Sequence, residues 1–259
     1  MGLLPRTLIR LGAMFTPEDR SRLRDAIIAV ARADARITSA ALTGSVALGA
    51  EDRWSDIDVA LGVAGEADPE GVVADWTDYM YRECGAVHHV DVNWGSTLFR
   101  VFLLASTLQV DLAFWPAAEF GAIGPTFRLL FGTAKERPMQ QPPDAAVLIG
   151  MAWLHALHAR SSIARGRVWQ AEYMLSGMRD QVLALACLRH GVPSVQGRGI
   201  DSLPPEVTAA VSGGLVRSLD AAELRRAFGV VTGALIAEIE RADAGLANRL
   251  AAPLKELTG

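Results

Sequence analysis

The sequence predicts an α+β fold, in which an N-terminal domain with a mixed sheet of about five strands and flanking helices precedes a C-terminal α-helical bundle. Up to about residue 137, segments of strand period alternate with segments of helical period, and from Asp144 onward only the helical period remains. Between them lies "KERPMQQPP" (Lys135–Pro143), whose three prolines and two glutamines are typical of a linker. We therefore expect domains at 1–137 and 144–259, joined by a linker at 138–143.

The first domain opens with the helix "TPEDRSRLRDAIIAVARAD", where Thr16 and Asp19 have capping-box spacing and Pro17 occupies the first helical position. Strands are expected at "RITSAALTGS" and "SDIDVALGV", a helix at "PEGVVADWTDYMYREC", and strands at "AVHHVDVNW", "LFRVFLL" and "LQVDLAFW". Only Ala105-Ser106-Thr107 separates the last two strands, which predicts an antiparallel hairpin.

The second domain is predicted to be a bundle of helices. The segment "DAAVLIGMAWLHALHARSSIARG" begins at a capping residue, Asp144, and the next helix, "VWQAEYMLSGMRDQVLALACLRHG", ends at Gly191. After a Gly/Pro-rich loop and a shorter helix, "DAAELRRAFGVVTGALIAEIERAD" opens with Asp220 and Glu223 at capping-box spacing.

Composition excludes several classes of protein. The 259 residues carry a net charge of −4, and the part up to Pro143 holds 13 Lys+Arg against 18 Asp+Glu, so the basic excess of a nucleic-acid-binding protein is missing. Cys84 and Cys187 fit no metal or redox spacing, which is typical of a reduced intracellular protein. No long uncharged apolar run exists, and arginines interrupt the N-terminal "MGLLPRTLIRLGAMF". We expect a loosely held leader, a cytoplasmic protein, and no nucleic-acid or membrane partner.

Two strands place carboxylates among residues with small side chains. Because side chains alternate along a strand, Asp56 and Asp58 share a face with Ala60 and Gly62, while the opposite face is apolar. "LQVDLAFW" repeats the pattern, with Asp111 on a face that also carries Gln109, Ala113 and Trp115. Like charges brought together require a neutralising cation, and hard oxygen ligands suit Mg²⁺. The sequence thus predicts a magnesium site made of Asp56, Asp58 and Asp111.

A Gly-Ser pair precedes these acids at a strand-to-helix junction. Gly44 removes a side chain that would block phosphate, Ser45 adds a hydroxyl donor, and a helix N-terminus offers unpaired N–H groups. The pattern Gly44-Ser45, ten residues, Asp56-x-Asp58 and a later single acid resembles the nucleotidyltransferase superfamily typified by DNA polymerase β. Within it, the chain looks like the aminoglycoside and lincosamide antibiotic nucleotidyltransferases, which also have a helical domain after the catalytic one.

The resemblance implies transfer of AMP from ATP to a hydroxyl of a small molecule, with two Mg²⁺ ions. By that match Gly44 and Ser45 hold the triphosphate, Asp56 and Asp58 hold Mg²⁺, and Asp111 is a metal ligand or the general base. Asp91 in "HHVDVNW" competes with Asp111 for the third position, but Asp111 lies on the second arm of the hairpin, as the family plan requires.

Three further residues, Glu172, Arg179 and Trp115, are candidates for ligand contacts. Glu172, Ser176 and Arg179 fall on one stripe of the second bundle helix, either as an ordinary solvated face or with Glu172 on the acceptor and Arg179 on a phosphate. Glu172 is also an alternative general base. Trp115 shares the face of Asp111, where it either stacks on a base or sugar or packs in the core.

The reaction, the nucleotide, the accepting hydroxyl and the oligomeric state stay open at this point. AMP transfer to a partner protein is an alternative reaction, and a non-catalytic nucleotide-binding regulatory module is an alternative of another class. Whether ATP or another nucleotide is used, and which hydroxyl accepts it, is not determined by the sequence. The chain is expected to act as a monomer or a homodimer.

Overall fold

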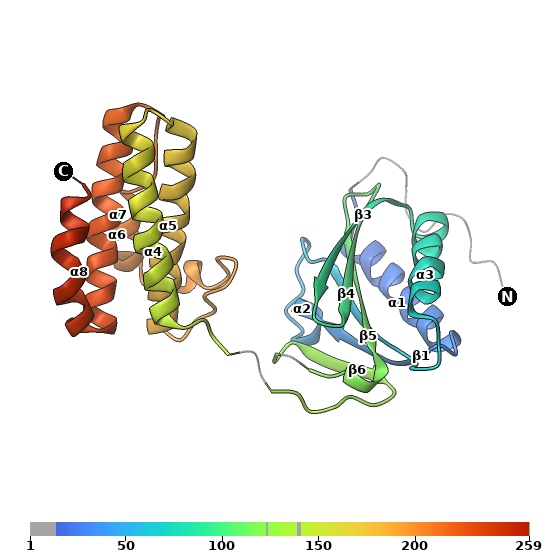
Figure 1. The fold of residues 1–259 in the computed structure, drawn as a ribbon. Helices are drawn as coiled ribbons and strands as arrows, with labels where there is room; N and C mark the ends of the chain where they lie inside the picture. The colour runs from blue at the N-terminus through green and yellow to red at the C-terminus, as the bar shows by residue number, and fades with distance from the viewer. Residues whose placement is uncertain (1–13, 123, 139–140, 259) are drawn as a thin grey trace. The chain divides into compact units, whose positions relative to one another are not determined.

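The computed structural model describes residues 14–122, 124–138 and 141–258, and these form an α+β protein as expected (Figure 1). The chain divides into two compact units, Met1–Gln140 and Gln141–Gly259, at a point inside the segment 138–143. Each unit is described by itself below. The leader expected over the first 15 residues falls mostly on residues 1–13, outside the described part of the chain.

Unit 1 is built on a mixed sheet. The described strands are β1 (Ile37–Thr43), β2 (Ile57–Val63), β3 (Ala86–Trp94), β4 (Thr97–Leu104), β5 (Gln109–Pro116) and β6 (Phe127–Phe131). Their order is β3-β4-β5-β2-β1-β6, and β2 and β5 pair in parallel while all other neighbours are antiparallel. The β4–β5 hairpin is confirmed, with Thr107 at a positive φ of 68° in its turn.

The strand β6 was not expected from the sequence. Its five residues, Phe-Arg-Leu-Leu-Phe, show no alternation of apolar and polar side chains, so the period-2 signal is missing. It pairs with β1 and adds an edge to the sheet. The expected number of about five strands is therefore corrected to six within the described residues.

Two helices cover one face of the sheet, α1 (Pro17–Ala33) and α3 (Pro69–Glu83) (Figure 1). The capping box of α1 is formed in both directions, because Thr16 Oγ1 accepts from the Asp19 N–H and Asp19 Oδ2 accepts from the Thr16 N–H at 3.1 Å. The core between this layer and the sheet includes the apolar side of β2, namely Ile57, Val59, Leu61 and Val63.

The opposite face of the sheet carries a small buried apolar cluster at one end. There Trp115 and Phe120 pack with alanines of three neighbouring strands, Ala41, Ala60 and Ala113. The short helix η1 (Ala117–Glu119) leads into Phe120. The other end of this face holds the aspartates predicted as the site.

Unit 2 consists of α4 (Ala145–Ala164), α5 (Val168–Arg189), η2 (Ile200–Ser202), α6 (Pro205–Ser212), α7 (Ala221–Ala242) and α8 (Ala244–Glu256). Asp144 caps α4 by accepting a hydrogen bond from the Ala146 N–H at 2.8 Å. The capping box expected at α7 is not formed. Asp220 accepts from the Ser218 hydroxyl, and Glu223 accepts from the Arg217 N–H, so both carboxylates bind the preceding loop instead.

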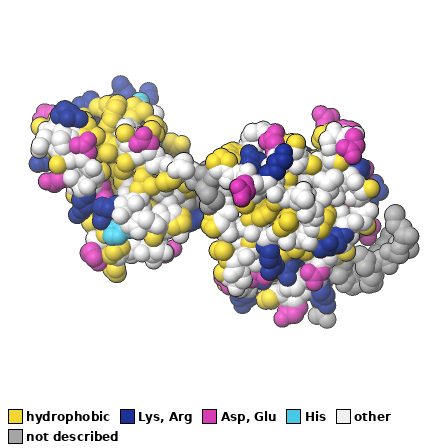
Figure 2. Space-filling model, turned by 90° about the horizontal axis from the view of Figure 1, so that it is seen from below, with side chains coloured by type: hydrophobic (Ala, Val, Ile, Leu, Met, Phe, Trp, Pro, Cys, Tyr) yellow, Lys and Arg dark blue, Asp and Glu magenta, His cyan; other side chains and the backbone are white. Residues whose placement is uncertain are grey.

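The described helices include none that is long and apolar enough to cross a membrane. On the face seen in Figure 2, basic and acidic side chains are interspersed over both units.

Candidate active site

A sharp turn at Gly44 brings the end of β1 against Asp58. Gly44 has a φ of +65°, and a Cβ added there would lie 2.0 Å from Asp58 Oδ2. Glycine is therefore required twice, for the left-handed backbone and for the close approach. Gly44 is predicted from the sequence to leave space for phosphate, but in the structure the Asp58 carboxylate occupies the space beside it.

The helix that follows the turn, α2 (Gly44–Ala47), is a single turn. A helix this short has unpaired N–H groups but little of the macrodipole that the sequence analysis invoked, because that dipole is a sum over aligned peptides. Ser45 is half-buried, and its hydroxyl has no hydrogen-bond partner among the described residues. It is placed to donate to a ligand at the turn.

Strand register places two of the three predicted acids side by side. Asp58 in β2 and Asp111 in β5 are directly paired in the parallel ladder, so their side chains leave the same face of the sheet. Asp56 lies just before β2, two residues from Asp58, and both of these aspartates are half-buried. The alternation seen in the sequence thus becomes a cluster of acids at one end of the sheet face.

Gln109 joins two of these acids, a role that the sequence analysis did not assign to it. Its side-chain amide donates to Asp111 Oδ1 at 3.0 Å and lies 3.4 Å from Asp56 Oδ2. The sequence contains one sign of this contact, because Gln109 lies two residues before Asp111 and therefore on the same face of β5. The second oxygen of that carboxylate, Oδ2, has no hydrogen-bond partner within the residues described.

The environment of Asp111 raises its pKa to about 6. Burial is the main cause, and the negative charge of Asp56 adds to it, while the hydrogen bond from Gln109 acts in the opposite direction. A carboxylate with such a pKa is mostly ionised at neutral pH and still basic enough to accept a proton.

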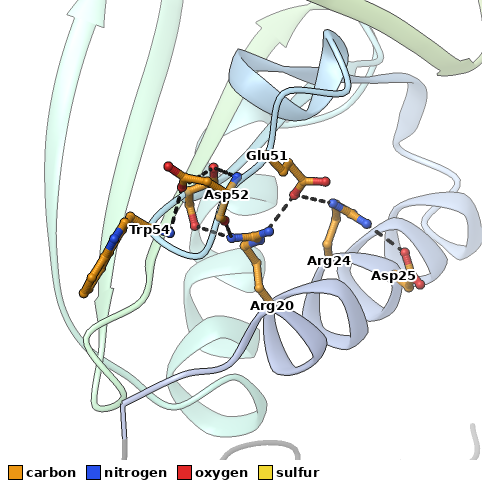
Figure 3. A network of polar contacts seen from close by, with 7 residues as sticks. Arg20, Arg24, Asp25, Glu51, Asp52 and Trp54 are labelled. Atoms are coloured by element: carbon orange, nitrogen blue, oxygen red, sulfur yellow. Dashed lines mark hydrogen bonds and ion pairs between the residues drawn. The ribbon is translucent and has the colours of Figure 1, made fainter.

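The loop between α2 and β2 is fastened to α1 (Figure 3). The buried Arg20 donates to the carbonyl oxygens of Asp52 at 2.5 Å and Ser55 at 3.1 Å, and its Nε lies 3.2 Å from Glu51 Oε1. Arg24 binds the same carboxylate at 2.7 Å. Since this loop joins the Gly-Ser turn to Asp56, these arginines fix the distance between the two halves of the motif.

Arg20 was missed by the sequence analysis, although the sequence contains a signal for it. It lies on the buried stripe of α1, together with Leu23, Ile27 and Ala31. An arginine on the apolar side of an amphipathic helix requires buried acceptors, and here these are the two carbonyl groups of the loop.

The chemistry of the three acids suits Mg²⁺, but their side chains are not arranged as a complete site. Among the described residues no group of three His, Cys, Asp or Glu side chains is positioned to hold a metal ion. Asp58 and Asp111 are adjacent, and the Gln109 amide lies between Asp111 and Asp56, where it offers N–H groups to both. The donor set fits a hard cation once the carboxylates turn toward one another.

Two other candidates of unit 1 are in environments that explain them structurally. Trp115 is only 4 % exposed and makes edge contacts with Trp94 and Phe99, which favours core packing over stacking on a ligand. Asp91 forms a two-pronged ion pair with Arg100, at 2.7 and 2.6 Å, on the other face of the sheet. Asp91 therefore does not join the acid cluster.

In unit 2 the predicted stripe of α5 is present. Arg179 donates to the Ser176 hydroxyl at 2.6 Å, and both side chains are half-buried, as is Glu172. Glu172 has no ion pair among the described residues. The proposed contacts of Glu172 with an acceptor and of Arg179 with a phosphate stay predictions.

No protein-family model matches the sequence, and no curated protein matches it. The chain is similar in structure to an aminoglycoside 6-adenyltransferase from Bacillus subtilis, known from a crystal structure. The two share 13 % sequence identity and a TM-score of 0.41, over 90 % of this chain and 96 % of that one. A likeness this distant carries no functional argument, so the function is argued from the residues of the site.

Proposed function

We propose that the protein is a Mg²⁺-dependent nucleotidyltransferase that moves AMP from ATP to a hydroxyl of a small molecule, such as an aminoglycoside or lincosamide antibiotic. One observation carries the proposal, namely the pairing of Asp58 with Asp111 across two parallel strands, beneath a Gly-Ser turn that touches Asp58. Asp56 and Asp111 form no ion pair with a described residue, and the charge of Asp56 bears on the buried Asp111 carboxyl, so a bound cation would neutralise the negative charge at this end of the sheet face.

In this proposal, Asp111 acts as the general base. Its Oδ1 is held by Gln109, which leaves Oδ2 to accept the proton of the acceptor hydroxyl. The acceptor oxygen then forms a bond to the α-phosphorus as the bond to pyrophosphate breaks, and pyrophosphate leaves with the electron pair. Asp56 and Asp58 would hold Mg²⁺, which supplies charge neutralisation for the phosphates when it is bound.

The Gly-Ser turn would hold the phosphates. The Ser45 hydroxyl and the N–H groups of α2 are donors at the edge of the acid cluster, and Arg20 and Arg24 keep the loop between turn and acids in place. Glu172 and Arg179 of unit 2 are proposed as acceptor and phosphate contacts.

The test is transfer of label from α-labelled ATP, together with pyrophosphate release, against a panel of hydroxyl-bearing antibiotics. The wild type is expected to label an antibiotic only when Mg²⁺ is present, and Asp58→Asn is expected to lose at least about 100-fold in turnover. Label on added protein instead would favour the alternative of AMP transfer to a partner protein. Nucleotide binding without any transfer would identify a regulatory module and overturn the proposal.

Two glycines allow a matched test of the nucleotide site. Gly44 and Gly49 have nearly the same positive φ, +65° and +67°, but a Cβ at Gly49 would meet nothing within 4 Å. Gly44→Ala and Gly49→Ala thus impose the same backbone strain, and only the first displaces Asp58. We expect Gly44→Ala to weaken Mg·ATP binding at least about tenfold in calorimetry, and Gly49→Ala to change it less than about threefold. Equal losses would place the nucleotide elsewhere.

A further inference from the structure

The sheet face that carries the aspartates continues over β3 and β4 as an exposed apolar surface. We call it the β3–β4 surface, and it consists of Val90, Val92, Trp94, Phe99, Val101 and Leu103. Val90, Val92, Trp94 and Leu103 are between 43 % and 55 % exposed. Single exposed apolar residues are ordinary on a protein surface, but a contiguous set of six is typical of a binding site.

Register makes this surface continuous with the acids. Val90 pairs with Val101, Val101 pairs with Asp111, and Asp111 pairs with Asp58, so one row across four strands runs from apolar to acidic. In the next row of paired residues on this face, Leu103 of β4 is opposite Gln109 of β5. Paired residues have their Cβ atoms about 4.5–5.5 Å apart. A molecule with a hydroxyl at Asp111 would therefore lie against Val101 with its neighbouring atoms.

The β3–β4 surface carries no carboxylate within the described parts of these two strands. The remaining side chains of β3 and β4 on that face are His88 and Thr97. Asp91 points to the other face, where Arg100 neutralises it. An acceptor with several ammonium groups would find no counter-charge here, and placing these groups on valine and leucine would remove their water without compensation.

We infer that the acceptor is a hydroxyl compound with a largely apolar body and at most one ammonium group, which lies on the β3–β4 surface while its hydroxyl meets Asp111. This inference rests on the proposed function and narrows it, because it favours an amphiphilic acceptor over a polycationic one. Apolar contact supplies affinity in proportion to the area removed from water, and the exposed leucine and valines offer that area one and two strands away from the base.

The experiment compares two acceptors and two substitutions at one position. Val90→Thr keeps the shape of the side chain and replaces a methyl group with a hydroxyl, while Val90→Ile keeps the side chain apolar. Both threonine and isoleucine are β-branched residues suited to a strand. With lincomycin as the apolar-bodied probe, we expect Val90→Thr to raise KM about three- to tenfold without changing the KM for ATP. Val90→Ile is expected to stay within about twofold of wild type.

A second pair of variants, Leu103→Gln and Leu103→Met, repeats the comparison of a polar with an apolar substitution in the row of paired residues that contains Gln109. Kanamycin, a polycation, is expected to be a poor acceptor in every variant. Unchanged lincomycin KM values in both polar variants would overturn the inference, as would efficient transfer to kanamycin. A loss of self-association in Val92→Lys by light scattering, with acceptor KM unchanged, would assign the surface to a second copy of the chain and overturn it too.

Binding is measured separately, so that failure of the proposed function can be told apart. Calorimetry with lincomycin, in the absence of ATP, is expected to show binding that Val90→Thr weakens and Val90→Ile keeps. If the wild type transfers no AMP but binds lincomycin, and Val90→Thr weakens this binding while Val90→Ile keeps it, the proposed function fails. The β3–β4 surface is then still supported as the binding site. If lincomycin does not bind, the inference fails whether or not nucleotide is transferred.

Discussion

Asp91 in β3 and Asp111 in β5 occupy nearly identical sequence patterns and opposite environments. Each lies in a strand between apolar neighbours. Asp91 receives two hydrogen bonds from Arg100, which hold its pKa below the usual range. Asp111 is more deeply buried, accepts a hydrogen bond from the Gln109 amide and lies near the carboxylates of Asp56 and Asp58, and its pKa is raised to about 6.

The difference comes from the cross-strand neighbour, which the sequence of one strand cannot specify. Asp91 pairs with Arg100, whereas Asp111 pairs with Val101 on one side and Asp58 on the other. An ion pair satisfies one aspartate structurally, and the other is left able to bind a cation or take a proton.

The largest expected effect is on turnover, which should fall when Asp111 is changed and stay almost the same when Asp91 is changed. Asp111→Asn preserves size and removes basicity, so we expect a loss of at least about 100-fold in AMP transfer with Mg·ATP still bound. Asp91→Asn is expected to stay within about threefold of wild type, because its carboxylate lies on the other face. Transfer kinetics of the purified variants, with calorimetry for ATP, measure both. Near-normal turnover in Asp111→Asn would remove it from the site.

The pH dependence of stability is the next effect in size. The folded-state pKa of Asp111, about 6, lies above the usual 3.8, so the folded protein holds this proton more tightly than the unfolded chain. Its contribution to stability is present below about pH 4 and is lost as the pH rises to about 6. In EDTA, the wild type should therefore lose on the order of 1–2 kcal/mol relative to Asp111→Asn over that interval.

Asp91→Asn is the control for this titration. Its lowered pKa places its own stability change below about pH 4, so its difference from wild type should be constant between about pH 4 and 6. Urea unfolding at a series of pH values measures both differences. A constant difference for Asp111→Asn as well would mean that this carboxyl has an ordinary pKa in the folded protein.

Much of this site was predictable because a strand has a strict period of two. The faces of β2 and β5, the hairpin that ends in β5 and the turn at Gly44 follow from local pattern. Tertiary neighbours were not predictable in the same way. The bridge from Gln109, the clamp of Arg20 on the loop and the burial of Trp115 depend on which strands and helices meet, and β6 has no period that reveals it.

A substitution at Glu172 is expected to have a smaller effect on the kinetics, and it tests whether Asp111 or Glu172 is the general base. It lies on α5, where the helical period predicts a shared stripe with Ser176 and Arg179 but no partner strand fixes its role. We expect Glu172→Gln to raise the acceptor KM about fivefold and to leave turnover within about twofold of wild type. If Glu172→Gln instead abolishes turnover while Asp111→Asn mainly raises KM, the base is Glu172.

The smallest expected effect is the stability of the Asp91–Arg100 pair. The pair is two-pronged, and Arg100 also donates to the Thr77 hydroxyl at 2.6 Å, so its guanidinium keeps a partner when Asp91 is changed. Asp91 is at the margin of exposure, with 37 % of its side chain accessible against 15 % for Arg100, so water screens part of the attraction.

Asp91→Asn keeps one oxygen acceptor for Arg100 and removes the charge. We expect a loss of about 0.5–1 kcal/mol in the free energy of unfolding at low salt, and about half of that in 1 M NaCl, because salt screens a partly exposed pair. Urea titration of wild type and variant at the two salt concentrations measures this difference. A loss that is insensitive to salt would mean that the geometry of the two hydrogen bonds, rather than charge, is what the pair contributes. A fall in turnover as large as that of Asp111→Asn would instead show that the structural partner of Arg100 also takes part in catalysis, and the contrast between the two strands would no longer hold.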